Sequence, residues 1–324
     1  MARYKHYDYD QLQMVAVSLE DQLVPGTLEY AIHHVIEDRL DTSRFDARFK
    51  NDETGRVAYD PKILLKIVLL SYARGVMSSR KMERACRENI LYMALSCGQS
   101  PDHSTLAAFV STMGQEDVTD LFTQVLLVCE EEGLLGGTHM SIDGLKLPSN
   151  AAKEWSGTYS DLDKKKKKLE AKIKEAIQEH REEDRKGGDR DGARRKQQME
   201  KLQKQADRID RYLRESSPKI GRQGKEIQGN ITDPESAKMV SSHGVVQGYN
   251  ANAVVDEKHQ VIVHGQAIGE GDDGVNAGPM LEGASRNLAV VLEKENPLQG
   301  RIISADTSYF SLENLKACQK HEVD

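Results

Sequence analysis

Two aspartates each end a short apolar run of the sequence. Asp143 ends the stretch "HMSID" and Asp306 ends "RIISAD", and a small or polar residue follows each acid. Adjacent strands lie about 4.8 Å apart, so two such acids on neighbouring strands repel and raise each other's pKa unless a cation lies between them. Mg²⁺ suits this place because it binds hard oxygen ligands and keeps water and phosphate in its other positions. A strand-terminal aspartate also commonly caps the turn or helix that follows, so the pattern alone leaves both interpretations open.

The elements that would position these acids change in type near residue 137. Residues 1–136 have apolar residues at helical spacing and predict an all-helical domain. Residues 137–324 predict an α/β domain with the order strand, helical insertion, two strands, helix, strand, helix. The strand over 301–306 is interpreted as buried because it is mostly apolar.

The insertion, at about residues 160–216, is predicted to be a charged antiparallel helical hairpin. The stretch "GGDRDG" separates its two arms. The second arm has the alternating three-four spacing of a coiled-coil seam at Met199, Leu202, Ala206, Ile209 and Leu213.

Charge is distributed unevenly along the chain. The formal net charge of −7 argues against a wholly basic nucleic-acid binder. Residues 153–216 hold 20 lysines and arginines against 15 acids, a net charge of +5, which leaves −12 for the rest. No apolar run reaches the roughly 20 residues that span a bilayer, and the first residues lack the apolar core of a secretory signal. We therefore expect a cytoplasmic protein that does not enter a membrane.

Three stretches resemble the D-D-E transposases of bacterial insertion sequences. They are "SIDGLKLPSNAAKEWSGTYSDL", "NITDPESAKMVSSHGVVQGYNANAVVDEKHQVIV" and "IISADTSYFSLENL". The helical stretch from "AYDPKILLKIVLL" to "SPDHSTLAAF" is similar to the N-terminal domain of the InsH-like members, so the resemblance runs from about Asp60 to Leu315. It implies a ribonuclease-H-like catalytic core in which Asp143 and Asp306 bind Mg²⁺, for which Mn²⁺ can substitute. It also implies a homo-oligomer that binds element ends and target DNA, with the hairpin inserted after the first core strand.

The family pattern includes a third acid, a glutamate on a helix well beyond the second aspartate. This sequence stops at Asp324, and Glu313 and Glu322 are too near Asp306 to fill that role. The resemblance therefore implies a truncated transposase with an incomplete, inactive site. The alternative is a non-catalytic remnant that binds DNA or forms oligomers.

A basic cluster in the helical region is the candidate for contact with DNA. It consists of Arg74, Arg80, Lys81, Arg84 and Arg87. Such a cluster binds phosphates beside a helix-turn-helix, or it forms an ordinary solvated helix face. The expected recognition helix, "DHSTLAAFVSTM", contains no lysine or arginine, which argues against sequence-specific reading there.

Two further groups of polar residues are weaker candidates for a functional role. His243, Gln247, Tyr249 and Asn250 in "HGVVQGYNAN" could face DNA or the active centre, or could equally form a polar strand edge. Asp272 and Asp273 lack the spacing of a calcium-binding loop and are interpreted as part of a simple loop.

Overall fold

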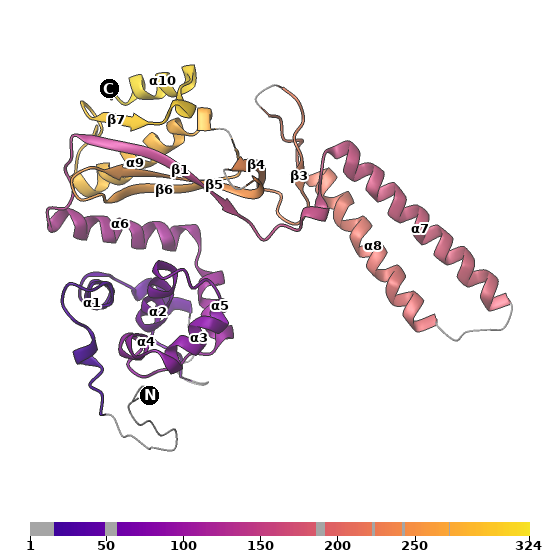
Figure 1. The fold of residues 1–324 in the computed structure, drawn as a ribbon, viewed down its shortest axis with the longest axis horizontal. Coiled ribbons are helices and arrows are strands. Elements are labelled where there is room, and N and C mark those ends of the chain that lie inside the picture. The colour runs from indigo at the N-terminus through magenta and orange to yellow at the C-terminus, as the bar shows by residue number, and fades with distance from the viewer. Residues whose placement is uncertain (1–15, 49–56, 186–191, 222–223, 242–243, 272) are drawn as a thin grey trace, which may run out of the picture. The chain divides into compact units, whose positions relative to one another are not determined.

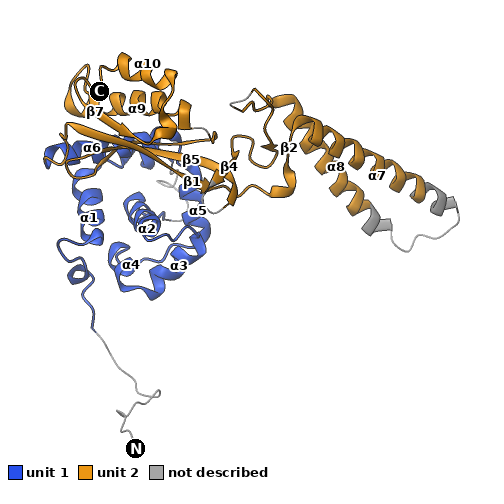
Figure 2. Cartoon of the chain, turned by 45° about the horizontal axis from the view of Figure 1, so that its top comes forward, with its two compact units in different colours: residues 1–132 blue, residues 133–324 orange. Residues whose placement is uncertain are grey.

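The computed structural model describes residues 16–48, 57–185, 192–221, 224–241, 244–271 and 273–324. The chain divides into two compact units, residues 1–132 and 133–324 (Figure 2). The first unit is helical and the second contains a mixed sheet with helices, so the expected helical N-terminal region and mixed α/β class are confirmed.

The described part of the first unit contains six α-helices. They are α1 (Leu28–His34), α2 (Pro61–Ala73), α3 (Ser79–Glu88), α4 (Ile90–Leu95), α5 (His103–Thr112) and α6 (Gln115–Glu131) (Figure 1). Side chains cap several of them, because the first backbone N–H groups of a helix have no partner within it. Asp60 accepts a hydrogen bond from the Lys62 N–H, with Pro61 at the helix start, and Asp102 caps α5 in the same way. Helix α2 is apolar on nearly all sides and lies in the core of the unit.

Five strands form the sheet of the second unit. They are β1 (His139–Pro148), β4 (Ala237–Ser241), β5 (Gly244–Asp256), β6 (Ile262–Ile268) and β7 (Ile302–Ala305). Strand β5 pairs antiparallel with β4, β6 and β1, whereas β7 pairs parallel with β1. Strands β1 and β5 approach closely at Gly248, where a Cβ atom would lie 1.9 Å from the Leu147 carbonyl oxygen. A larger residue is excluded there, so this glycine maintains the long β1–β5 ladder.

Helix α9 (Ala277–Leu292) follows β6 and packs on β6 and β5, and α10 (Leu312–Lys320) packs on α9. The contact face of α9 is mostly apolar, with Met280, Leu281, Ala284 and Leu288 at most 1% exposed, and Asn287 donates a hydrogen bond to the Val263 carbonyl of β6. This helix forms the connection between β6 and β7, and thereby brings β7 back beside β1 (Figure 1).

Strand β7 is mostly exposed, contrary to the expectation of a buried strand. Its residues Ile302, Ser304 and Ala305 are exposed, because β1 is the only named strand that pairs with it. The last residues of the chain lie along its other side, where the Ile303 N–H donates to the Asp324 carbonyl and the Asp324 N–H to the Arg301 carbonyl. An apolar run of this length does not show whether a strand lies in the centre of a sheet or near its edge.

The charged hairpin consists of α7 (Tyr159–Arg185) and α8 (Gly192–Glu215), which pack against each other (Figure 1). Its base is joined by the short strands β2 (Ser156–Gly157) and β3 (Gly229–Asn230). Leu162, Ile209, Tyr212 and Ile231 form a small buried core there. None of the described helices is both long enough and apolar enough to span a membrane.

Candidate functional site

The pairing of β1 with β7 determines where the two predicted acids lie. The last paired residues in this parallel ladder are Ile142 and Ala305. Asp143 directly follows Ile142, and Asp306 directly follows Ala305. The two aspartates therefore occupy equivalent positions on adjacent segments of the sheet, about 4.8 Å apart. Both residues are exposed. The sheet thus brings together two carboxylates that are 163 positions apart in the sequence.

Asp306 also caps the 3-10 helix η6 (Thr307–Tyr309). Its Oδ1 atom accepts a hydrogen bond from the Ser308 N–H at 2.7 Å and a second from the Ser308 hydroxyl. The hydrogen bonds from Ser308 lower the pKa of the Asp306 carboxyl, so it stays ionised at neutral pH. Asp306 therefore caps the helix that follows it. The same hydrogen bonds keep its carboxylate in the charged form that binds a metal ion.

Asp143 precedes a glycine that lies against buried polar side chains. A Cβ atom on Gly144 would lie 2.5 Å from Asn252 Oδ1 and 3.2 Å from the Tyr309 hydroxyl. Tyr309 is 5% exposed and donates to Asn252 Oδ1 at 2.6 Å. Burial, and then the charges of Asp273, Asp143 and Asp306, raise the pKa of Tyr309. Three carboxylates therefore act on this one hydroxyl.

Asp273 is part of this polar cluster, although the sequence suggested only a loop. It begins the 3-10 helix η5 (Asp273–Val275) and lies 3.4 Å from Lys146 Nζ. The Asn250 amide donates to the same carboxylate, and the Ser308 hydroxyl lies 3.2 Å from Asp273 Oδ2. Ser308 therefore contacts both Asp273 and Asp306. The neighbouring Asp272 lies outside the described residues.

Two fully or nearly fully buried amides line the inner side of this cluster. Asn250 is 0% exposed and Asn252 is 2% exposed. The Oδ1 atom of Asn250 has no hydrogen-bond partner among the described residues, although such buried polar atoms are usually paired. The alternation of "GYNAN" places both amides on one face of β5. Asn250 was a candidate from the sequence and Asn252 was not, although this alternation is the signal that could have found it. His243, another candidate of that group, lies outside the described residues. Sequence alone could not show that Lys146 and Asp273 lie on the same face.

The acid pair has part of what a divalent metal ion needs from a protein. Within the part of the chain that the structure describes, no group of three His, Cys, Asp or Glu side chains is placed to bind a metal. Asp143 and Asp306 supply two hard oxygen donors, and Mg²⁺ is commonly bound through one or two carboxylates with water and phosphate completing its shell. The pair therefore fits Mg²⁺. Glu322 accepts a hydrogen bond from Gln299, and Glu313 lies in the first turn of α10.

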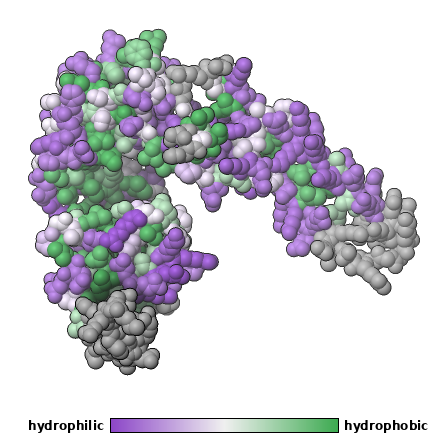
Figure 3. Space-filling model, in the orientation of Figure 1, coloured by the Kyte–Doolittle hydropathy of each residue, from purple (hydrophilic) through white to green (hydrophobic). Residues whose placement is uncertain are grey.

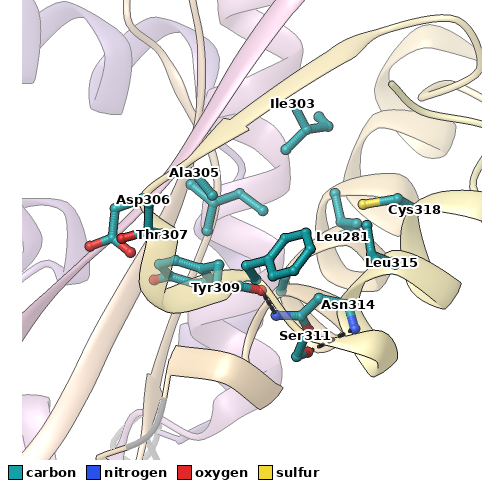
Figure 4. A pocket seen from close by; sticks show the side chains of 13 residues that line it. Leu281, Ile303, Ala305, Asp306, Thr307, Tyr309, Ser311, Asn314, Leu315 and Cys318 are labelled. Atoms are coloured by element: carbon teal, nitrogen blue, oxygen red, sulfur yellow. Dashed lines mark hydrogen bonds between the residues drawn. The ribbon is translucent and has the colours of Figure 1, made fainter.

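An apolar pocket of about 470 Å³ opens beside Asp306. Figure 4 shows Asp306 and Thr307 on one side of it and Leu281, Leu315 and Cys318 on the other. Phe310 also lines the pocket and is 76% exposed. The acid pair therefore lies at the border between a polar cluster and an apolar surface.

The five predicted DNA-binding residues of the first unit have different surroundings. Arg74 forms an ion pair with the buried Glu29, and Arg87 forms one with Glu83. Arg84 lies 3.8 Å from the exposed Glu88. Arg80 and Lys81 are exposed and make no ion pair with any described residue. Of the five candidates, Arg80 and Lys81 at the start of α3 are therefore the two without an ionic partner among the described residues.

Comparison with known proteins gives one match. Residues 17–112 match the family model described as Transposase domain (DUF772), which supports a transposase family for this chain. No curated protein and no solved structure matches the sequence. The matched segment lies in the helical unit, so the comparisons leave the role of the sheet to be inferred from its geometry.

Proposed function

We propose that this chain is a transposase, or part of one, that cleaves and joins DNA at an acid pair formed by Asp143 and Asp306. The transposase-domain match supports the family, and a protein of this kind acts on DNA. The observation that carries the catalytic proposal is the register of β1 and β7, which places the two aspartates at equivalent positions. We further propose that the sheet is a ribonuclease-H-like core of the D-D-E type. Its antiparallel β6, β5 and β1, with α9 leading to a parallel β7, support that assignment.

The roles of the protein side chains follow from their surroundings. Asp143 and Asp306 would hold Mg²⁺, or Mn²⁺ in its place. The bound ion would supply positive charge to the scissile phosphate and lower the pKa of an attacking water. Ser308 keeps the Asp306 carboxylate ionised and oriented. Lys146 pairs with Asp273, which limits the negative charge that a DNA phosphate would meet. The nucleophiles are water and then a 3′-hydroxyl, so no serine or tyrosine of the chain needs activation.

The test is nicking of supercoiled plasmid by the 324-residue chain in Mg²⁺ or Mn²⁺. Asp143→Asn keeps the size of the side chain and removes its charge, so we expect nicking to fall at least about 100-fold. Asp163→Asn, an exposed acid on the hairpin, is the matched control and should keep wild-type activity. Nicking by the Asp143→Asn variant at the wild-type rate, or nicking that persists in EDTA, would contradict the proposal.

A non-catalytic DNA-binding protein is the second candidate. It is favoured by one observation, the lack of a third metal-ligating side chain at the acid pair among the described residues. Under this alternative the chain binds DNA, Asp143→Asn binds equally well, and neither protein nicks it. The same assay, combined with a binding measurement, therefore separates the two.

A further inference from the structure

A row of exposed cations runs along one side of α8. It consists of Lys201, Lys204, Arg208 and Arg211, and we name it the α8 stripe. The spacing of three, four and three residues places all four side chains on the same side of a helix with 3.6 residues per turn. From first to last the stripe is about 15 Å long, at about 1.5 Å of rise per residue.

The stripe takes no part in the packing of the hairpin. Helix α8 contacts α7 through a different side, on which Ala206 and Ile209 are buried and Leu202 is half-buried. All four stripe residues are exposed. The visible surface of the hairpin is largely hydrophilic (Figure 3), and no large apolar side chain of α8 is among the exposed ones described.

Three other cations of the hairpin have acidic partners, whereas the stripe cations and several exposed lysines of α7 form no ion pair with a described residue. Lys167 pairs with Asp163 at 2.7 Å, and both Lys166 and Arg214 pair with Asp210. Among the described residues, none forms an ion pair or hydrogen bond with a stripe side chain. Like charges three and four residues apart on a helix repel by a few tenths of a kcal/mol per pair. Glu200, Asp207 and Glu215 lie at the same spacing from Lys204 and Arg211 and offset this repulsion in the free protein.

Acidic neighbours restrict the stripe to a single row. Glu200, Asp207 and Glu215 lie within one turn of it, whereas Lys201 and Arg208 have no acid three or four residues away. A stable protein interface normally contains an apolar centre, which this side of α8 lacks. A narrow row of lysines and arginines without apolar side chains suits a line of phosphates instead, which are bound by charge without reading of the bases.

We propose that the α8 stripe is a binding surface for the phosphate backbone of DNA. This inference rests on the proposed function, since it names where that function's DNA is held. The stripe contacts one strand along its length and contributes affinity rather than sequence preference, so its effect depends strongly on salt.

The test compares two double variants of the full chain that remove the same charge from the same hairpin. Lys204→Gln with Arg208→Gln removes two stripe cations, and Lys167→Gln with Arg214→Gln removes two cations that have acidic partners. Binding to a fluorescent duplex is measured by anisotropy from 50 to 300 mM salt. We expect the stripe variant to reduce the slope of log K against log salt by about 1.8, since each phosphate contact contributes about 0.9. The control variant should change the slope by less than about a third of that amount.

Several results would overturn the proposal. They are equal losses in both variants, an unchanged slope in the stripe variant, and no binding of duplex by the wild-type chain. A change of oligomeric state in the stripe variant with unchanged DNA affinity would also overturn it and would assign the stripe to contact between copies. Circular dichroism and melting temperature verify that both variants fold. Plasmid nicking that depends on Asp143 tests the proposed function separately, because failure of the stripe leaves that dependence intact.

Discussion

At the scale of single residues, Asp273 and Lys146 form an ion pair that Ser308 connects to Asp306. Their side chains are 22% and 19% exposed. Asp273→Asn leaves the Lys146 ammonium without its counter-charge and loosens the position of Ser308. We expect the nicking rate to fall about 10- to 100-fold, the usual effect of removing a residue that orients a metal ligand.

A double-mutant cycle gives this prediction its control. Lys146→Met removes the other charge of the pair, so Asp273→Asn should cost less in the Lys146→Met background than in the wild type. Nicking rates of the four proteins, measured at several Mn²⁺ concentrations, provide the comparison. Strictly additive losses would mean that the two residues act independently of each other.

Sequence reasoning found some residues of this cluster and missed others for a clear physical reason. Asp143 and Asp306 were identified because each follows an apolar run that had to be a strand. Asp273 was missed because its contacts depend on how η5 lies against β5 and η6, which no local pattern shows. Arg74 was grouped with its neighbours by sequence alone, and its partner Glu29 is 45 positions earlier.

At the scale of elements, the basic residues around α3 separate into structural and free ones. Arg74→Gln would leave the Glu29 carboxylate, 6% exposed, without its charged partner. We expect a loss of about 1–3 kcal/mol in the free energy of unfolding, measured by urea denaturation.

The double variant Arg80→Gln with Lys81→Gln is the matched comparison. These exposed residues pair with no described residue, so stability should change by less than about 0.5 kcal/mol. If α3 contacts DNA, this variant binds duplex more weakly, whereas Arg74→Gln at a temperature where it is folded does so much less. Equal stability of Arg74→Gln and the wild type would contradict the structural role of the Glu29 ion pair.

The burial of a strand was harder to predict than its position along the chain. Strands β1, β5, β6 and β7 lie where alternating apolar residues and turn residues predict strands, but β4 and the short strands β2 and β3 were not predicted. The exposure of β7 did not follow, since burial depends on how many neighbours a strand has. Its apolar residues instead border the pocket formed with α9 and α10.

At the scale of the whole molecule, each unit supplies a different kind of support for a transposase. The helical unit carries the match to a transposase domain, and the second unit carries the acid pair. The net charge of −7 does not reveal the basic hairpin. The overall composition therefore argues against a nucleic-acid partner, whereas the distribution of charge along the chain favours one. The third acid of the family pattern has no counterpart at the pair among the described residues, and the catalytic proposal therefore depends on two carboxylates.

The most direct measurement is a crystal structure of the 324-residue chain grown with Mn²⁺, with anomalous differences recorded. Our proposal predicts an anomalous peak in contact with carboxylate oxygens of both Asp143 and Asp306, and its loss in the Asp143→Asn variant. If the two carboxylate groups were more than about 8 Å apart, they could not bind the same pair of metal ions, which lie about 4 Å from each other. That geometry, or Mn²⁺ bound only elsewhere, would contradict the assignment of this pair as the catalytic site.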